Sequence, residues 1–283
     1  MPMRADSSWS FFGLVLFGLV LFGRVLFGLI LFGLIWFGLG LLPSRAQAYE
    51  LFSFVQDGKT RYLKWGDKRA PSMGGQVTWS IVPAGVAGDP DFCAAACPGN
   101  SVDQLRIEVA PGAGFADHSL ESLRPRIAVA LNRWAAAAGM RFVAVADAGL
   151  PINGPTALPP LTGHIRISAF AFSAEGAAVG YAPPPNGGSA AGDLIFNSQA
   201  FFQFAAAGEG QTYDPSFAPN DFETLLMHEL GHTLGLAHPP YDGSCPLMQV
   251  NPACQSRVNR VPDADDRAGL QFLYAGIFTD GFD

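Results

Sequence analysis

His228-Glu-Leu-Gly-His-Thr-Leu-Gly-Leu-Ala-His-Pro239 is the most informative stretch of the chain, because it holds three of the five histidines. In a helix, His228 and His232 lie four residues apart on one face, so their imidazoles can reach the same ion. Gly235 can end that helix in a left-handed conformation and bring His238 round as a third ligand. Three nitrogen ligands and one open position predict a catalytic zinc site, since a structural site is closed by four ligands.

Glu229 follows the first of these histidines directly. It is rotated from His228 by roughly 100° around the helix axis, so its carboxylate can address a water molecule on the metal. This position predicts a general base. Met248 stands ten residues beyond His238. The long histidine pattern followed by a methionine turn is the signature of the metzincins, and the chain resembles them in both parts.

The composition and charge of the chain limit the kinds of molecule that it can bind. The chain has 283 residues, which suits one fairly large domain or two small ones, and 49% of them are hydrophobic. The net charge is −7, and no basic run is longer than Lys68-Arg69. Nucleic acid binding requires a clustered positive surface, so we do not expect a nucleic acid partner.

Residues 1–48 are predicted to be a secretory signal peptide. Residues 11–42 are almost wholly apolar and repeat with a five-residue period, after Arg4 and before the cleavage pattern that ends at Ala48. Cleavage there would release residues 49–283 to the extracellular space or the periplasm. The apolar run is also long enough to span a bilayer, so an uncleaved membrane anchor is the alternative. Arg24 in the middle of the run disfavours a stable span.

Four cysteines fit an exported chain and allow three pairings. The expected pairs are local, Cys93 with Cys97 and Cys245 with Cys254. A zinc ribbon is not expected, because the cysteine spacing matches no such site.

Hydrophobic patterns predict a mixture of strands and helices. Strands are expected at 62–65, 76–82, 141–146, 164–168, 179–182 and 193–197, and residues 83–118 are expected to be loop. The strand at 164–168 alternates apolar and polar residues, which predicts that it is half-buried. One helix is expected at 122–140, with Pro125 in its first turn and Gly139 at its end. The metal-binding helix is expected to begin near Asn220, with Glu223 completing a capping box. A last helix is capped by Asp263. The expected buried stripes are Ile127, Leu131, Trp134 and Ala138; Phe222, Leu226, Leu230 and Thr233; and Leu270, Leu273 and Tyr274.

From about Tyr62 to Tyr274 the chain resembles the matrixin-like metzincins, a family of zinc endopeptidases. Besides the zinc motif and Met248, looser matches are the Trp134 helix and the segments 179–183, 192–197 and 265–274. The resemblance implies an α+β fold for residues 49–283: a twisted mixed β-sheet with two long helices, the active-site helix among its elements, then the methionine turn and a C-terminal helix. It also implies that Met248 forms a hydrophobic floor beneath the ligands.

The resemblance implies that the substrates are proteins or peptides and that the enzyme is a monomer. Val179, Gly180 and Tyr181 would offer an edge strand to which a peptide pairs through main-chain hydrogen bonds. The segment from Met248 to Pro262 would form a wall of the pocket for the residue after the scissile bond.

The chain also departs from the matrix metalloproteases. It lacks the Pro-Arg-Cys-Gly switch of their pro-segment. Tyr181 and Ile195 stand where two histidines of the family's second zinc site would be, and His164 replaces an aspartate, which weakens a calcium site as well. We therefore expect one catalytic Zn²⁺ and no structural zinc, with His118 and His164 as ordinary surface or strand histidines.

Two alternatives to a secreted protease remain open. A non-catalytic secreted binding module could keep the same fold, although the presence of Glu229 argues against it. A membrane-tethered protease would differ only in retaining residues 1–48.

Overall fold

The computed structural model describes residues 49–72, 74–88, 99–152, 164–171, 176–185 and 188–274. The chain divides into two units, residues 1–46 and residues 47–283, and the described residues all belong to the second. The predicted signal peptide and the Cys93–Cys97 pair lie outside the described residues. Within the described residues, no helix combines the length and apolar character needed to cross a membrane.

A mixed five-stranded sheet forms the centre of the second unit. Its first four strands are parallel, and the last, at the edge, is antiparallel to its neighbour. The order is β7 (Arg141–Ala144), β4 (Gln76–Ile81), β8 (Ile165–Phe170), β10 (Leu194–Asn197) and β9 (Ala178–Gly180). The edge position of β9 leaves one side of that strand open for pairing.

Three smaller sheets complete the strand arrangement. One has four strands, in the order β12 (Asn220–Asp221), β11 (Phe201–Gln203), β5 (Gln104–Glu108) and β6 (Phe115–Ser119). The other two are the pair β1 (Glu50–Leu51) with β13 (Leu236–Ala237) and the hairpin of β2 (Ser53–Gln56) with β3 (Lys59–Tyr62). Short 3₁₀ turns occur at η1 (Gly188–Ala190) and η2 (Pro252–Cys254).

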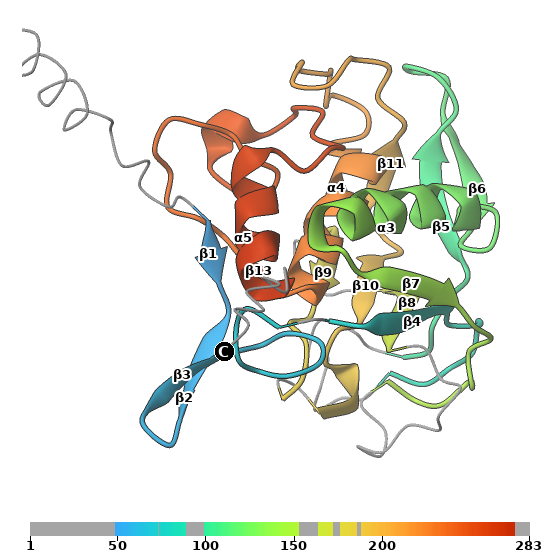
Figure 1. The fold of residues 1–283 in the computed structure, drawn as a ribbon. Helices are drawn as coiled ribbons and strands as arrows, with labels where there is room; N and C mark the ends of the chain where they lie inside the picture. The colour runs from blue at the N-terminus through green and yellow to red at the C-terminus, as the bar shows by residue number, and fades with distance from the viewer. Residues whose placement is uncertain are drawn as a thin grey trace, which may run out of the picture. The chain divides into compact units, whose positions relative to one another are not determined.

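Three helices gather on one side of the five-stranded sheet (Figure 1): α3 (Arg124–Ala138), α4 (Phe222–Thr233) and α5 (Ala264–Tyr274). The indole of Trp134, which is fully buried, donates to the carbonyl of Met227 at 3.0 Å and so ties α3 to α4. Gly139 ends α3 with φ 61°, a left-handed conformation that glycine adopts without strain. The predicted α+β fold with a mixed sheet and long helices is confirmed.

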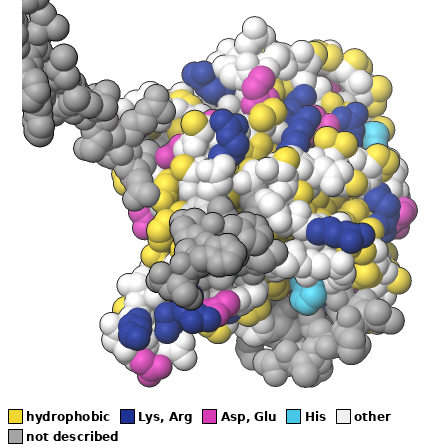
Figure 2. Space-filling model, in the orientation of Figure 1, with side chains coloured by type: hydrophobic (Ala, Val, Ile, Leu, Met, Phe, Trp, Pro, Cys, Tyr) yellow, Lys and Arg dark blue, Asp and Glu magenta, His cyan; other side chains and the backbone are white. Residues whose placement is uncertain are grey.

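Most of the predicted apolar stripes lie in this core. All three members from α5 and all four from α4 are buried, as are Ile127, Leu131 and Trp134 from α3. Some charged side chains are buried as well, among them Lys64, Arg166 and Asp193. On the face in Figure 2, Lys and Arg side chains are interspersed with apolar, acidic and uncharged ones.

Two strand predictions were wrong. The region 83–118, expected to be loop, contains β5 and most of β6. These strands are short, and the turn between them holds Gly112 and Gly114, which interrupt the pattern. The strand expected at 62–65 instead ends at Tyr62. The chain turns there around Lys64, whose buried ammonium donates to the carbonyls of Trp65 and Ser72.

Two further predictions require correction. Strand β8 was expected to be half-buried, but it is buried on both faces, because Arg166 points inward and pairs with Asp147. The cap of α4 is Asp221 and not Asn220. Asp221 Oδ2 accepts from the N–H of Thr224 at 3.0 Å, whereas Asn220 is paired with Phe202 in the strand before the helix.

Candidate metal centre

Helix α4 carries His228, Glu229 and His232 at the positions that the motif predicts. The carboxylate of Asp221 caps the first turn and is held by Arg260, with 2.5 Å between Oδ1 and Nη2. At the other end, Gly235 has φ 104°, and a Cβ there would lie 2.4 Å from the carbonyl oxygen of Leu63. Glycine is therefore required both for the turn and for the close approach of the neighbouring backbone at Leu63.

The three histidines converge. His238 Nε2 lies 3.0 Å from His228 Nε2 and 2.9 Å from His232 Nε2. Among the described residues, these three form the group whose ligand atoms are close enough to share one ion.

The tautomer of two histidines follows from their hydrogen bonds. His228 Nδ1 lies 2.7 Å from the carbonyl of Leu247, and His232 Nδ1 lies 2.8 Å from the carbonyl of Leu236. A carbonyl can only accept, so each neutral ring carries its proton on Nδ1 and turns a lone pair on Nε2 towards the others. Converging lone pairs repel unless a cation lies between them. The donor set therefore fits a zinc ion held by neutral imidazoles whose outer nitrogens are hydrogen-bonded.

Burial keeps these rings neutral. It lowers the pKa of His232 to about 3, with a further contribution from the charge of His228. Burial likewise lowers the pKa of His238 to about 4. Metal binding requires the deprotonated ring, so the site is already in its binding form near neutral pH.

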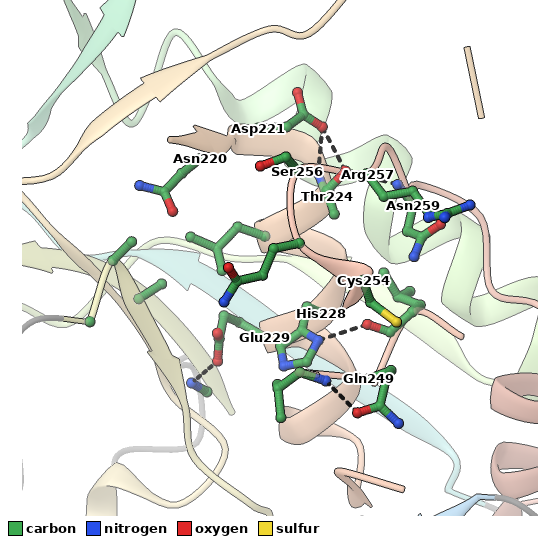
Figure 3. Close-up of a pocket in the computed structure, with 18 of the residues that line it drawn as sticks. Asn220, Asp221, Thr224, His228, Glu229, Gln249, Cys254, Ser256, Arg257 and Asn259 are labelled. Atoms are coloured by element: carbon green, nitrogen blue, oxygen red, sulfur yellow. Dashed lines mark hydrogen bonds between the residues drawn. The ribbon is translucent and has the colours of Figure 1, made fainter. Parts of the chain in front are cut away.

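Glu229 is buried beside the triad. The N–H of Gly180 on β9 donates to Glu229 Oε2 at 2.6 Å. Burial raises the pKa of Glu229 to about 7, although the Gly180 hydrogen bond acts in the opposite direction. A carboxyl with this pKa can both accept and return a proton near neutral pH. Figure 3 shows His228 and Glu229 projecting from α4 into the same pocket.

Residues 115–275, more than half of the chain, match the family model for the matrixins. The chain belongs to the matrixin family. It is 34% identical over 82 residues to a protein described as a matrix metalloproteinase in Spodoptera frugiperda ascovirus 1a, an alignment that covers 26% of this chain and 21% of that protein. It is 28% identical over 168 residues to matrix metalloproteinase-25 of Mus musculus, covering 56% of this chain and 24% of that protein. The chain thus spans about a quarter or less of the length of these relatives.

In this matrixin, Met248 lies beneath the motif. Its side chain is buried, and a Cβ added at Gly231 would lie 2.3 Å from Met248 Sδ. Gly231, the first of the two glycines in the histidine motif, therefore allows the thioether to approach the helix closely. Asp266 on α5 fixes the turn, since its carboxylate accepts from the N–H groups of Leu247 and Met248 at 3.2 and 3.3 Å. The sequence reasoning missed Asp266, whose only signal was its place in the match to segment 265–274.

The disulfide predicted between Cys245 and Cys254 is present, with 5.4 Å between the Cα atoms. It closes the loop that contains Met248.

Strand β9 requires a closer description than the sequence allowed. The N–H of Tyr181 donates to the carbonyl of Asp193, and the N–H of Asn197 donates to the carbonyl of Ala177. Antiparallel pairing alternates, so Val179 and Tyr181 direct their peptide groups towards β10. The outward peptide groups belong to Ala178 and Gly180. Of the three predicted residues, only Gly180 thus presents its main chain to the site, and Ala178 was missed.

The metal centre opens into a groove of about 980 Å³. Strand β9 forms part of its lining, together with residues from the segment 248–262 that was predicted to form a wall. These are Gln249, Val250, Cys254, Gln255, Ser256, Arg257 and Asn259.

The two remaining histidines lie elsewhere. His164 Nδ1 is 2.8 Å from the hydroxyl of Thr78, and the ring of His118 contacts that of Phe204 with 5.8 Å between centroids. Ile195, which stands where the resemblance would place a zinc ligand, is buried in β10.

Proposed function

We propose that this matrixin is a zinc-dependent endopeptidase in which His228, His232 and His238 hold the metal and Glu229 is the general base. The observation that carries the proposal is the convergence of three Nε2 atoms, two of them on rings whose Nδ1 protons are already donated to carbonyls. When bound, zinc would polarise the scissile carbonyl and lower the pKa of a water molecule to about 7.

Glu229 would transfer a proton from the attacking water to the leaving amine. Its Oε2 is held by Gly180, which orients the carboxylate and leaves Oε1 to take a proton from the attacking water. The same carboxyl can then give that proton to the leaving amine. Burial favours this exchange, because it brings the pKa of Glu229 to about 7.

The substrate would pair with the free side of β9. The outward peptide groups of Ala178 and the carbonyl of Gly180 can bond to an extended peptide, whereas the N–H of Gly180 is occupied by Glu229. The peptide side chain after the scissile bond would then point into the groove between α4 and the segment 248–262.

A peptide library tests the function. The purified protein should cleave library peptides, lose activity with a chelator and regain it when zinc is returned. Elemental analysis should find one zinc per chain, as the departures from the matrix metalloproteases predict. Two tightly held zinc ions would show a second metal site. Zinc binding without cleavage of any peptide would instead support a binding module on the same fold.

We further propose that the protein is exported and cleaved after Ala48. The pattern Ala46-Gln-Ala48 at the end of the apolar run supports this. N-terminal sequencing of the extracellular or periplasmic protein should begin at Tyr49. Recovery of the intact N-terminal segment in the membrane fraction would support a tethered protease.

A further inference from the structure

The N-terminal arm, residues 49–63, lies against the loop that joins His232 to His238. β1 pairs antiparallel with β13, which places Glu50 opposite Ala237 and Leu51 opposite Leu236. The ladder continues where the N–H of Phe52 donates to the carbonyl of Gly235 at 3.0 Å. The matrixin match begins only at residue 115, so the family comparison assigns no role to this arm.

The pairing determines where the carbonyl of Leu236 points. Phe52 and Gly235 form a hydrogen-bonded pair, and such pairs alternate with non-hydrogen-bonded ones along an antiparallel ladder. Leu236, opposite Leu51, is therefore in a non-hydrogen-bonded pair and directs its carbonyl away from β1. That carbonyl accepts the Nδ1 proton of His232 at 2.8 Å. The arm thus supports the hydrogen bond that selects the ligating tautomer of His232.

The side chain of Phe52 acts on the same histidine directly. Its ring lies against the His232 ring, with 5.7 Å between centroids and an interplanar angle of 49°. Phe52 also lines the groove that contains His228, Glu229 and His238. A half-buried phenyl ring in this position restricts rotation of the imidazole and presents an apolar surface to whatever occupies the groove.

We propose that residues 50–52 of the N-terminal arm are part of the metal centre: β1 fixes the Leu236 carbonyl, and Phe52 holds the His232 ring and forms a substrate-contacting surface. The inference rests on the proposed function, because it assigns the arm a part in the same site. Phe52 is a positioning residue for His232. Residues 50–52 should therefore influence zinc affinity as well as substrate binding.

Two phenylalanines of the arm provide a matched pair of variants. Phe54 lies two residues along in β2, opposite Arg61, is half-buried like Phe52, and is not among the groove-lining residues. Phe52→Ala in the full chain should weaken zinc binding on the order of tenfold, as loss of a group that orients a metal ligand typically does. It should also raise KM for a cleaved peptide. Phe54→Ala should leave both values within about twofold of the parent.

Zinc affinity is measured by competition with a chelating indicator, which requires no catalysis. The visible spectrum of the cobalt-loaded protein gives a second readout, because it reports ligand geometry at the metal. The spectrum should change in Phe52→Ala and should superimpose on that of the parent in Phe54→Ala. If Phe52→Ala does not fold, Phe52→Leu retains apolar volume and should shift zinc affinity in the same direction by a smaller factor.

The outcomes separate this inference from the proposed function. A parent that binds zinc and cleaves peptides, with Phe52 variants indistinguishable from Phe54→Ala, overturns the role of the arm alone. A parent that binds zinc but cleaves nothing overturns the protease, while the affinity and spectral comparison still decides the role of Phe52 at the metal. A parent that binds no zinc overturns both.

Discussion

Two polar clusters in this matrixin differ in the source of their positive charge. The histidine cluster contains only neutral rings, and its converging Nε2 atoms are 2.9 and 3.0 Å apart. The second cluster surrounds Arg166 on β8, which is fully buried. Arg166 Nε and Nη2 each donate to Asp147 at 2.9 Å, and Nη2 also reaches the carbonyl of Leu150 at 2.7 Å.

The charges of the second cluster balance internally. The hydroxyl of Ser80 donates to Asp147 at 2.7 Å, beside the bonds from Arg166. A second acid, Asp193, accepts the main-chain N–H of Arg166, and burial raises the pKa of its carboxyl well above the usual range. One guanidinium and one carboxylate therefore compensate each other, and burial disfavours a further negative charge on Asp193 beside them.

The presence or absence of a protein cation among the acceptors distinguishes a cluster that is suited to a metal ion from one that is not. In the histidine cluster, the Nδ1 protons of His228 and His232 are donated to carbonyls, so their converging Nε2 acceptors are suited to a cation from outside. Acceptors that surround a guanidinium already have one. The second cluster lies on the strands where the matrixin resemblance would place additional metal ligands, and we infer that Arg166 supplies a permanent positive charge there.

The largest effect should come from Glu229→Gln. Glutamine retains an oxygen for the N–H of Gly180 but cannot take a proton, so kcat should fall roughly 10²–10⁴-fold. Zinc content should stay at the parent value, because Glu229 is not a ligand. Peptide cleavage and elemental analysis on one preparation test both statements. A variant as active as the parent would remove Glu229 from the mechanism.

Arg166→Met should have the next largest effect, on stability instead of catalysis. It leaves the buried Asp147 carboxylate without its cation, and breaking a buried pair typically costs about 3–5 kcal/mol. The free energy of unfolding, measured by urea titration, should fall by that order while zinc affinity is unchanged. Arg124→Met, which breaks the exposed pair with Glu121, is the control and should change stability far less. Equal losses in the two variants would show that the second cluster is not held by its ion pair.

The histidine cluster could be predicted from sequence and the Arg166 cluster could not. Helical periodicity alone places His228 and His232 on one face, and Gly235 marks the turn to His238. Arg166 was taken as the polar side of a half-buried strand, because alternation says nothing about a partner 19 residues away. Such pairings depend on how distant segments pack, and one sequence does not record that.

The same limit applies around the site. Asp266 holds the methionine turn from another helix, and Phe52 reaches His232 from the N-terminal arm. The disulfide was predictable because its loop is short. The β5–β6 pair was missed because β5 is held by distant segments of the chain. It pairs with β11, and just before it Val102 forms a bridge to Ala169.

Acid should lower the stability of the zinc-free protein through protonation of the histidine cluster. The folded pKa of His238 is lowered to about 4 by burial, whereas an unfolded histidine titrates near about 6.5. As pH falls below about 6.5, the unfolded chain takes up this proton first, so the group's contribution to stability is lost towards pH 4. His238→Gln should therefore become more stable relative to the parent between these pH values.

The comparison is made on chelated protein by thermal unfolding at several pH values. Burial raises the pKa of Glu229 and of Asp266 to about 7, and these acids act in the opposite sense, since protonation stabilises the fold as pH falls. Both acids are present in the parent and in His238→Gln, so their contributions largely cancel when the stabilities of the two proteins are subtracted. A difference that does not change with pH would mean that His238 is not held neutral by its surroundings.

The smallest effect should come from removing the disulfide. This change separates the two clusters because it should lower both stability and zinc affinity. Replacing Cys245 and Cys254 together with serine opens a loop with a sequence separation of 9 and should lower the free energy of unfolding by about 2–3 kcal/mol. That loop carries Leu247, whose carbonyl orients His228 at 2.7 Å, so zinc affinity should fall as well. Arg166→Met should lower stability by more and leave zinc affinity unchanged. If the cysteine variant loses stability but binds zinc like the parent, the Leu247 carbonyl is positioned by Asp266 without help from the disulfide.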